Sequence, residues 1–192
     1  KEGEREALFE QIKKLGDDGE LIWASGQASV EEIETENIVG ATCLAMKRAM
    51  DEVSFKSKKI WSPQEKSENS LFSGLSKNEQ GSWIVSVDGR PMKRLPYIHD
   101  GLIKGDTFSL AIAMGSLVAK VTRDRLMRKL AEKFPAYDFS SNKGYGSPKH
   151  LTGLRASGPC PHHRPRFLRN LLGQVAEGKT ISPDKQSQLS FS

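Results

Sequence analysis

Cysteine is scarce in this chain of 192 residues, which contains only two, Cys43 and Cys160. Two cysteines cannot build the disulfide framework of a small secreted domain, and such sparse use favours a reducing compartment. No apolar run reaches the roughly 18 residues that a membrane-spanning helix needs, so we expect no membrane partner. The chain opens with KEGEREALFEQ, which contains neither a methionine nor a signal peptide. We therefore expect that upstream sequence is absent, and that the protein is cytoplasmic unless a targeting peptide in that upstream part directs it to an organelle.

Acidic residues are outnumbered by basic ones. The chain holds 29 lysines and arginines against 24 aspartates and glutamates, which gives a formal net charge of +5 and a pI of about 9.2. This balance favours an anionic partner such as nucleic acid, although mild basicity without a functional role is the alternative. Hydrophobic residues make up 36% of the chain and charged residues 28%, which suffices for one globular domain with its own core.

The first third of the chain predicts a helix, a strand and a second helix. Apolar residues recur at helical spacing over residues 4–16, and Gly16 is a stop signal. The stretch 20–29, ELIWASGQAS, is a candidate for a short strand. Residues 29–53 again have helical spacing, with Ser29 as the expected N-cap and glutamates in the first turn.

Residues 54–82 differ in composition from the segments on either side. Serine, lysine, glutamate and asparagine dominate, and no hydrophobic periodicity is left. Such a segment buries too little apolar surface to offset the entropy of ordering, so we expect a flexible insertion. Residues 174–192 form a polar tail that we also expect to be disordered.

Strands and helices alternate after the insertion. The expected elements are a strand over 83–89, a long helix over about 107–134, and short helices over 147–158 and 165–173. Pro135 ends the long helix, and Ser147 caps the helix that follows the glycine-rich turn at 141–150. This alternation indicates a single α/β domain over residues 1–173.

The long helix combines an apolar face with a polar stripe. Ser116, Lys120 and Asp124 are four residues apart, which stacks them on one face of a helix. The opposite face is apolar and comprises Leu110, Met114, Leu117 and Val121. A buried lysine and aspartate are costly unless they are paired, so the stripe must face a partner.

Two aspartates are candidates for metal chemistry. Asp88 ends the strand 83–89, and ligands in open α/β sheets bind beyond the carboxyl ends of strands. An aspartate that begins a turn is the alternative. Asp124 could likewise form only an i, i+4 pair with Lys120. Phosphodiester hydrolysis commonly uses two divalent cations held by clustered carboxylates, and these two residues would supply half of such a cluster.

Three blocks of sequence, in this order and spacing, resemble ribonuclease HII, the type 2 ribonuclease H family. They are SVDGRP followed by LPY, then KGDTFSLAIAMGSLVAKVTRDRLM, then FPAYDFSSNKGYGSPKHLTGLRASGPCPHHRPRF. The upstream EIETENIVGATCLAMKRA resembles the family helix that precedes the aspartate strand. The resemblance covers residues 1 to about 172 except the insertion at 54–82.

The resemblance implies a ribonuclease H-like fold, with a mixed sheet flanked by helices and helical C-terminal additions. It also implies a metal-dependent endonuclease that uses Mg²⁺ or Mn²⁺ and acts as a monomer. The substrates would be the RNA strand of RNA/DNA hybrids and ribonucleotides embedded in DNA, and the products would carry a 5′-phosphate and a 3′-hydroxyl.

The matching positions also imply roles for individual residues. Asp88 and Asp124 occupy two of the family's four metal-binding carboxylate positions, with Lys104 and Asp106 in supporting positions next to them. Capping of the long helix is the alternative for Asp106. Tyr145 matches a tyrosine that packs on the sugar next to the cleaved bond, and an ordinary turn aromatic is its alternative. The expected contacts to nucleic acid or its phosphates are Ser116, Lys120, Lys143, His150, His163 and Arg164.

The CPHH stretch at 160–163 is not a zinc motif, because no second ligand pair stands at a suitable spacing. His163 and Arg164 match instead a His-Arg block that precedes a phenylalanine, here Phe167, although Pro165 and Arg166 depart from the family pattern.

The front of the chain departs from the family. The family's first two carboxylates lie in a D-E-x-G-R-G segment, whose Gly-Arg-Gly backbone reads the 2′-hydroxyl, and this chain has no such stretch. We therefore expect an N-terminally incomplete ribonuclease HII without its opening strands. A non-catalytic remnant that binds nucleic acid or a partner is the alternative, and the block 104–124 disfavours another metal nuclease of the superfamily.

Residues 188–191, QLSF, resemble a truncated sliding-clamp-binding peptide, a match that also arises by chance.

Overall fold

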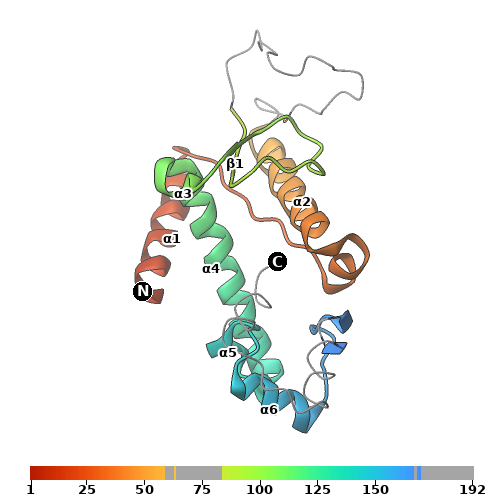
Figure 1. The fold of residues 1–192 in the computed structure, drawn as a ribbon. Coiled ribbons are helices and arrows are strands. Elements are labelled where there is room, and N and C mark those ends of the chain that lie inside the picture. Colours follow the sequence, from red (N-terminus) through yellow and green to blue (C-terminus); the bar gives the residue numbers. More distant parts are fainter. Residues whose placement is uncertain (59–62, 64–83, 167, 170–192) are drawn as a thin grey trace. The chain divides into compact units, whose positions relative to one another are not determined.

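A computed structural model of the chain describes residues 1–58, 63, 84–166 and 168–169 (Figure 1). The chain divides into two compact units. The first unit comprises Lys1–Gln27 and Thr42–Val121, and the second comprises Ala28–Ala41 and Thr122–Ser192. Most of the insertion expected at 54–82, the tail 174–192 and the clamp-like peptide 188–191 lie outside the described residues.

The first unit begins with helix α1, Glu2–Asp17, which confirms the helix predicted over 4–16. Phe9 and Ile12 form its buried face. The strand predicted over 20–29 is wrong, because residues 21–29 belong to no helix or strand of the described structure. Side chains satisfy this backbone instead: Arg48 Nη1 donates to the Gln27 carbonyl at 2.6 Å, and Lys56 Nζ donates to the Trp23 carbonyl at 3.1 Å.

Helix α2, Val30–Lys56, begins where the sequence predicts. Ser29 Oγ accepts from the Glu32 amide at 3.2 Å, and Glu32 Oε2 accepts from the Ser29 amide at 2.8 Å, which completes a capping box. The helix is interrupted at Asn37, where φ is 58°, and the Asn37 side chain accepts from the amides of the next turn. The prediction that the insertion begins at residue 54 is wrong, because residues 54–56 are the last of α2.

A two-stranded parallel sheet forms the centre of the first unit. Strand β1, Ser86–Asp88, pairs with β2, Asp100–Leu102, with Val87 opposite Gly101. A Cβ at Gly101 would lie 2.4 Å from Pro91 Cδ, so only glycine allows the connecting loop to cross here. The strand is shorter than the one predicted over 83–89. The core beside it comprises Cys43, Val87 and Leu95, with Met46, Met50 and Met92 packed against them.

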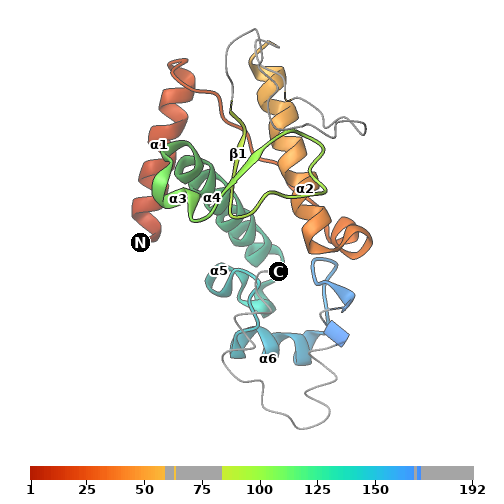
Figure 2. The same cartoon turned by 45° about the horizontal axis from the view of Figure 1, so that its top comes forward.

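The long helix predicted over 107–134 is divided into α3, Gly105–Phe108, and α4, Leu110–Lys133. The break lies at Ser109, which is extended and whose Oγ accepts from the Ile112 amide at 3.4 Å. The predicted apolar face is confirmed for Met114, Leu117 and Val121, which pack with Val118 against Phe9 and Ile12 of α1. Figures 1 and 2 show α1 beside α4. It is wrong for Leu110, which is 75% exposed at the start of α4.

The second unit is helical. From Thr122 onward α4 continues into a 3₁₀ turn η1, Pro135–Tyr137, followed by α5, Phe139–Asn142, and α6, Pro148–Ser157. Ser147 caps α6 as predicted, since its Oγ accepts from the His150 amide at 3.3 Å. The core of this unit comprises Tyr137, Phe139, Leu154, Cys160 and Leu168. Pro165, Arg166, Leu168 and Arg169 are helical, and the rest of the helix predicted over 165–173 lies outside the described residues.

The described structure is therefore a mixed α/β arrangement, mostly helical with a small parallel sheet, which confirms the predicted class at that level. In the part of the chain that is described, no helix is both long enough and apolar enough to cross a membrane.

Candidate functional site

Asp88 is the last residue of β1, and its carboxylate is exposed. Its Oδ1 accepts a hydrogen bond from the Gly105 amide at 2.8 Å. That amide belongs to the first residue of α3, where an N–H group has no partner within the helix, so the carboxylate acts as an external cap. One oxygen of Asp88 is thereby held in place, and the exposed side chain stays accessible to a cation.

Lys104 and Asp106 flank Gly105 in the sequence. Lys104 is the N-cap of α3 and has a left-handed backbone with φ of 55°. Asp106 lies inside α3 and is exposed, with its Oδ1 at 3.5 Å from Thr107 Oγ1. The alternative in which Asp106 caps the long helix is wrong, because the capping oxygens belong to Asp88 for α3 and to Ser109 for α4.

Asp124 differs from Asp88 in its burial. It lies in α4 and is 2% exposed, whereas Lys120 is half-buried and Ser116 is exposed on the same helix. A nearly fully buried carboxylate is rare unless it is paired or binds a cation. That Ser116, Lys120 and Asp124 face metal ions and a phosphate stays a prediction.

Arg123 ties the turn that carries Tyr145 to α4 next to Asp124. Its Nη2 donates to the Lys143 carbonyl at 2.8 Å, and its guanidinium carbon lies 5.8 Å from the centre of the Tyr145 ring. This distance allows a cation–π contact. Arg123 lies outside the stripe of residues four apart at 116, 120 and 124, so helical spacing did not predict its role. Lys143 itself has a left-handed backbone, and its Nζ donates to the Ser140 carbonyl at 2.6 Å.

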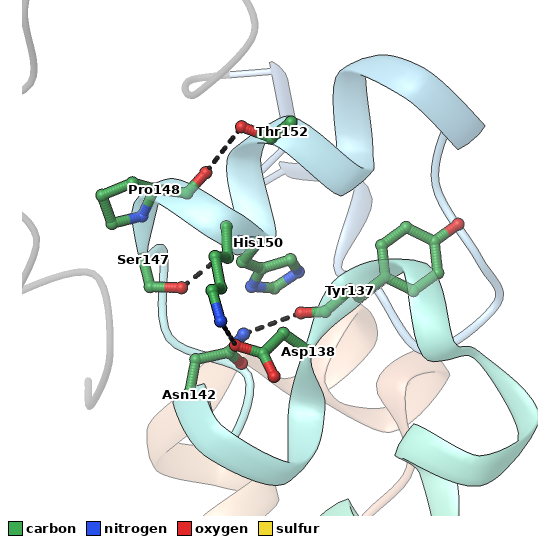
Figure 3. Close-up of polar contacts among 8 residues, drawn as sticks. Tyr137, Asp138, Asn142, Ser147, Pro148, His150 and Thr152 are labelled. Carbon is green, nitrogen blue, oxygen red and sulfur yellow. Dashed lines mark hydrogen bonds and ion pairs between the residues drawn. The ribbon is translucent and has the colours of Figure 1, made fainter.

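The backbone of Tyr145 is held on both sides. Its amide donates to the Asn142 carbonyl at 2.9 Å, and its carbonyl accepts from the Ser147 amide at 2.8 Å and lies 2.7 Å from His150 Nδ1. Asn142 is buried in turn and donates to the Tyr137 carbonyl at 2.7 Å (Figure 3). The Tyr145 turn is therefore fixed to η1, α5 and α6.

His150 and His163 are in direct contact, with 2.8 Å between their Nε2 atoms. The Cys160 amide donates to His163 Nδ1 at 3.0 Å. Figure 3 shows His150 near the start of α6, and only 3% of the residue is exposed. Both ring nitrogens of each histidine thus have partners within the chain.

The two histidines are also poor sites for a positive charge. Burial lowers the pKa of His150, while burial and the nearby His150 lower the pKa of His163 from 6.5 to about 4. The expected phosphate contacts of His150 and His163 stay predictions, and in this structure the nitrogens of both rings have partners within the chain. Their pairing is a contact across 13 residues that no local sequence signal reveals.

Arg164 is half-buried, and its carbonyl accepts from the Leu168 amide at 3.1 Å, so it begins the helical turn at 165–169. Arg166 Nε lies 3.8 Å from Glu34 Oε2. Phe167, the aromatic residue of the expected His-Arg block, lies outside the described residues.

The described residues do not assemble a complete metal site. Among them, no group of three or more histidines, cysteines, aspartates or glutamates is placed to hold a metal ion. Asp88 lies in the first unit and Asp124 in the second. Their carboxylate oxygens have the chemistry that hard divalent cations prefer, but these two residues are only part of a ligand set.

Comparison with known proteins places the chain in a family. The family model for ribonuclease HII matches residues 1–170. The relatives named ribonuclease HII include those of Burkholderia thailandensis, 36% identical over 163 residues, and Cupriavidus necator, 37% identical over 163 residues. Each alignment covers 85% of this chain. It covers 63% of the Burkholderia protein and 58% of the Cupriavidus protein. The ribonuclease HII of Caldanaerobacter subterraneus is 36% identical over 171 residues, which is 89% of this chain and 59% of that protein. The chain thus spans about three fifths of the length of these relatives.

Proposed function

The chain belongs to the ribonuclease HII family, and on that premise we propose that it is part of an endonuclease that hydrolyses RNA paired with DNA. The proposed substrates are the RNA strand of RNA/DNA hybrids and ribonucleotides embedded in duplex DNA. The proposed products carry a 5′-phosphate and a 3′-hydroxyl. The match over residues 1–170 is the single observation that carries this proposal.

Asp88 and Asp124 are the proposed metal ligands of this chain. Carboxylate oxygens suit Mg²⁺ and Mn²⁺, and the Gly105 amide already fixes one oxygen of Asp88. When bound, a pair of such ions activates a water molecule and stabilises the leaving oxygen of the phosphodiester. Because the described residues gather no third ligand, we propose that Asp88 and Asp124 belong to a larger carboxylate set, and that β1 and β2 belong to a larger mixed sheet of the ribonuclease H type.

The proposed nucleic-acid contacts divide into two groups. Lys120, Lys143 and Arg164 contact phosphates, and Ser116 donates to the nucleic acid. Tyr145 packs on the sugar next to the cleaved bond. The support for Tyr145 is its fixed backbone and the Arg123 guanidinium beside its ring, which tie it to the turn of α4 that carries Asp124.

A second candidate function is binding of RNA/DNA hybrids without cleavage. It is favoured by the incomplete ligand set among the described residues. The two candidates differ in one readout, because both predict salt-dependent binding of hybrids but only the first predicts strand scission.

The test uses protein expressed from the complete reading frame and end-labelled substrates. A 12-base-pair RNA/DNA hybrid and a DNA duplex with one ribonucleotide are incubated with Mg²⁺, with Mn²⁺ and with a chelator, and an all-DNA duplex is the control. We expect cleavage of the first two substrates with either metal ion, none of the control, and 5′-phosphate ends on the products. Binding without cleavage in both metals would select the second candidate.

A further inference from the structure

The pair His150–His163 is not used in the proposed catalytic site, yet the nitrogens of both rings have partners within the chain. The atoms form a continuous path from the Cys160 amide through His163 and His150 to the Tyr145 carbonyl, with separations of 3.0, 2.8 and 2.7 Å. We propose that His163 and His150 are positioning residues, which form an ordered chain of two neutral imidazoles that holds the Tyr145 turn in place for the nucleic acid. This inference rests on the proposed function.

The Tyr145 end of the path determines the position of every proton in it. The Tyr145 carbonyl can only accept, so His150 carries its proton on Nδ1, and its Nε2 is an acceptor. His163 must then donate from Nε2, so its Nδ1 accepts from the Cys160 amide at 3.0 Å and does not donate to the Cys160 carbonyl, which lies 3.3 Å from it. In the opposite pair of neutral tautomers, His150 Nδ1 and the Tyr145 carbonyl would both be acceptors. They would then lie 2.7 Å apart with no proton between them.

Aromatic rings enclose the two imidazoles. The Tyr137 ring lies 4.8 Å from that of His163 with an interplanar angle of 73°, and the Phe139 ring lies 5.3 Å from that of His150 at 81°. Both are edge-to-face contacts. Tyr137 is fixed in turn, because its hydroxyl donates to the Gly158 carbonyl at 2.7 Å. The cluster is therefore packed like a core, which suits a residue that positions others and not one that contacts a ligand.

The path ends at the residue whose side chain the proposed function needs. Donors from Ser147 and His150 converge on the Tyr145 carbonyl from α6 and its cap, while the Tyr145 ring lies against Arg123 of α4. Loss of the His150 donor would leave the carbonyl with a single backbone donor and free the turn to shift. A displacement of about 1 Å at a reacting group can cost on the order of a hundredfold in rate.

The first experiment observes the tautomers directly and needs no catalysis. Histidine-labelled ¹⁵N protein is measured at pH 7 by long-range ¹H–¹⁵N correlation, which distinguishes protonated from bare ring nitrogens. We expect His150 to carry its proton on Nδ1 and His163 on Nε2. An imidazolium at either position, or the opposite tautomer at His150, would overturn the proposal whether or not the protein cleaves.

The second experiment compares His150→Asn with His150→Leu. The asparagine amide places a donor near the position of Nδ1, whereas leucine fills the space without one. We expect His150→Asn to retain kcat for a single embedded ribonucleotide within about threefold, and His150→Leu to lower it on the order of tenfold or more with a smaller change in KM. The matched control is His162→Gln, at an exposed neighbouring histidine outside the path, which leaves both constants unchanged.

A third set of variants separates positioning from folding. In a Tyr145→Ala background, His150→Leu should lower kcat no further, because the residue that it positions is already absent. Equal defects in His150→Asn and His150→Leu, or fully additive losses with Tyr145→Ala, would overturn the positioning role. Wild-type protein that binds hybrids without cleaving them would refute the proposed function, while the tautomer measurement would still decide the arrangement of the path.

Discussion

The Gly105 amide donates a hydrogen bond to Asp88 Oδ1 at 2.8 Å, which joins the end of β1 to the start of α3. Asp88 therefore has a structural contact in addition to its proposed metal-binding role. The two roles depend on different properties of the carboxylate. The hydrogen bond needs an acceptor oxygen, whereas the metal ion needs negative charge.

Substitutions at Asp88 separate these properties. Without added metal, Asp88→Asn retains an acceptor for Gly105, so the free energy of unfolding should stay within about 0.5 kcal/mol of wild type. Asp88→Ala removes the acceptor and should cost about 1 kcal/mol. Urea unfolding followed by circular dichroism measures both. An Asp88→Asn protein as unstable as Asp88→Ala would mean that charge, and not the hydrogen bond, stabilises this corner.

Two helical glycines should respond oppositely to alanine. A Cβ on Gly153 would lie 2.0 Å from the Ala136 carbonyl oxygen, a backbone atom that cannot move independently, whereas a Cβ on Gly115 meets nothing within 4 Å. Gly153→Ala should therefore destabilise the protein by about 1–3 kcal/mol. Gly115→Ala should stabilise it by up to about 1 kcal/mol, because alanine favours the helix. Thermal unfolding of both variants tests the close contact between α6 and η1.

Stability should fall as the pH drops from about 6.5 toward 4. The folded-state pKa of His163 is about 4, so in this window the unfolded chain binds a proton that the folded chain does not. The lowered pKa of His150 acts in the same direction, and the other groups that act on the two rings include His162 and the backbones of Cys160 and Tyr145. The contribution is fully present above pH 6.5.

Because carboxylates also titrate near pH 4, the measurement compares wild type with His163→Gln. The free energy of unfolding of both proteins is measured in urea at pH 7.5 and pH 5. An identical pH dependence of the two proteins would contradict the assignment.

Tyr145 should affect cleavage more than binding. Stacking of its ring on the sugar aligns the bond, whereas phosphate contacts provide most of the affinity. We expect Tyr145→Ala to lower the cleavage rate at a single ribonucleotide on the order of tenfold or more, with Kd for the hybrid changed by less than about threefold. Tyr145→Phe keeps the ring and serves as the control. Parallel losses in rate and affinity would assign Tyr145 to packing.

Local signals in the sequence predicted most of the helices. Ser29 and Ser147 cap α2 and α6 because a serine at the N-cap satisfies amides of its own first turn, a contact within three residues. The interruptions were not predictable in this way. At Asn37 the chain adopts a positive φ inside a segment with helical spacing, and at Ser109 an extended residue separates α3 from α4.

Contacts between distant residues account for what the sequence did not predict. The stretch 20–29 has the composition of a strand, but strand formation needs a partner, and Arg48 and Lys56 bind its carbonyls instead. The pairing of His163 with His150 was not predictable either, because it depends on the fold of the second unit. Asp88 and Asp124 were identified from a strand end, a helix stripe and the family resemblance, and their role as metal ligands stays a prediction.

The most direct test of the account is the rate of hybrid cleavage by Asp88→Asn and Asp124→Asn, measured in protein from the complete reading frame at saturating Mg²⁺ or Mn²⁺. Asparagine keeps the size and hydrogen bonding of aspartate but removes the charge that holds the metal ions. Each variant should bind hybrids with nearly wild-type affinity yet lose on the order of a thousandfold or more in kcat. Cleavage by either variant within tenfold of wild type would contradict the assignment of these carboxylates to the catalytic metal site.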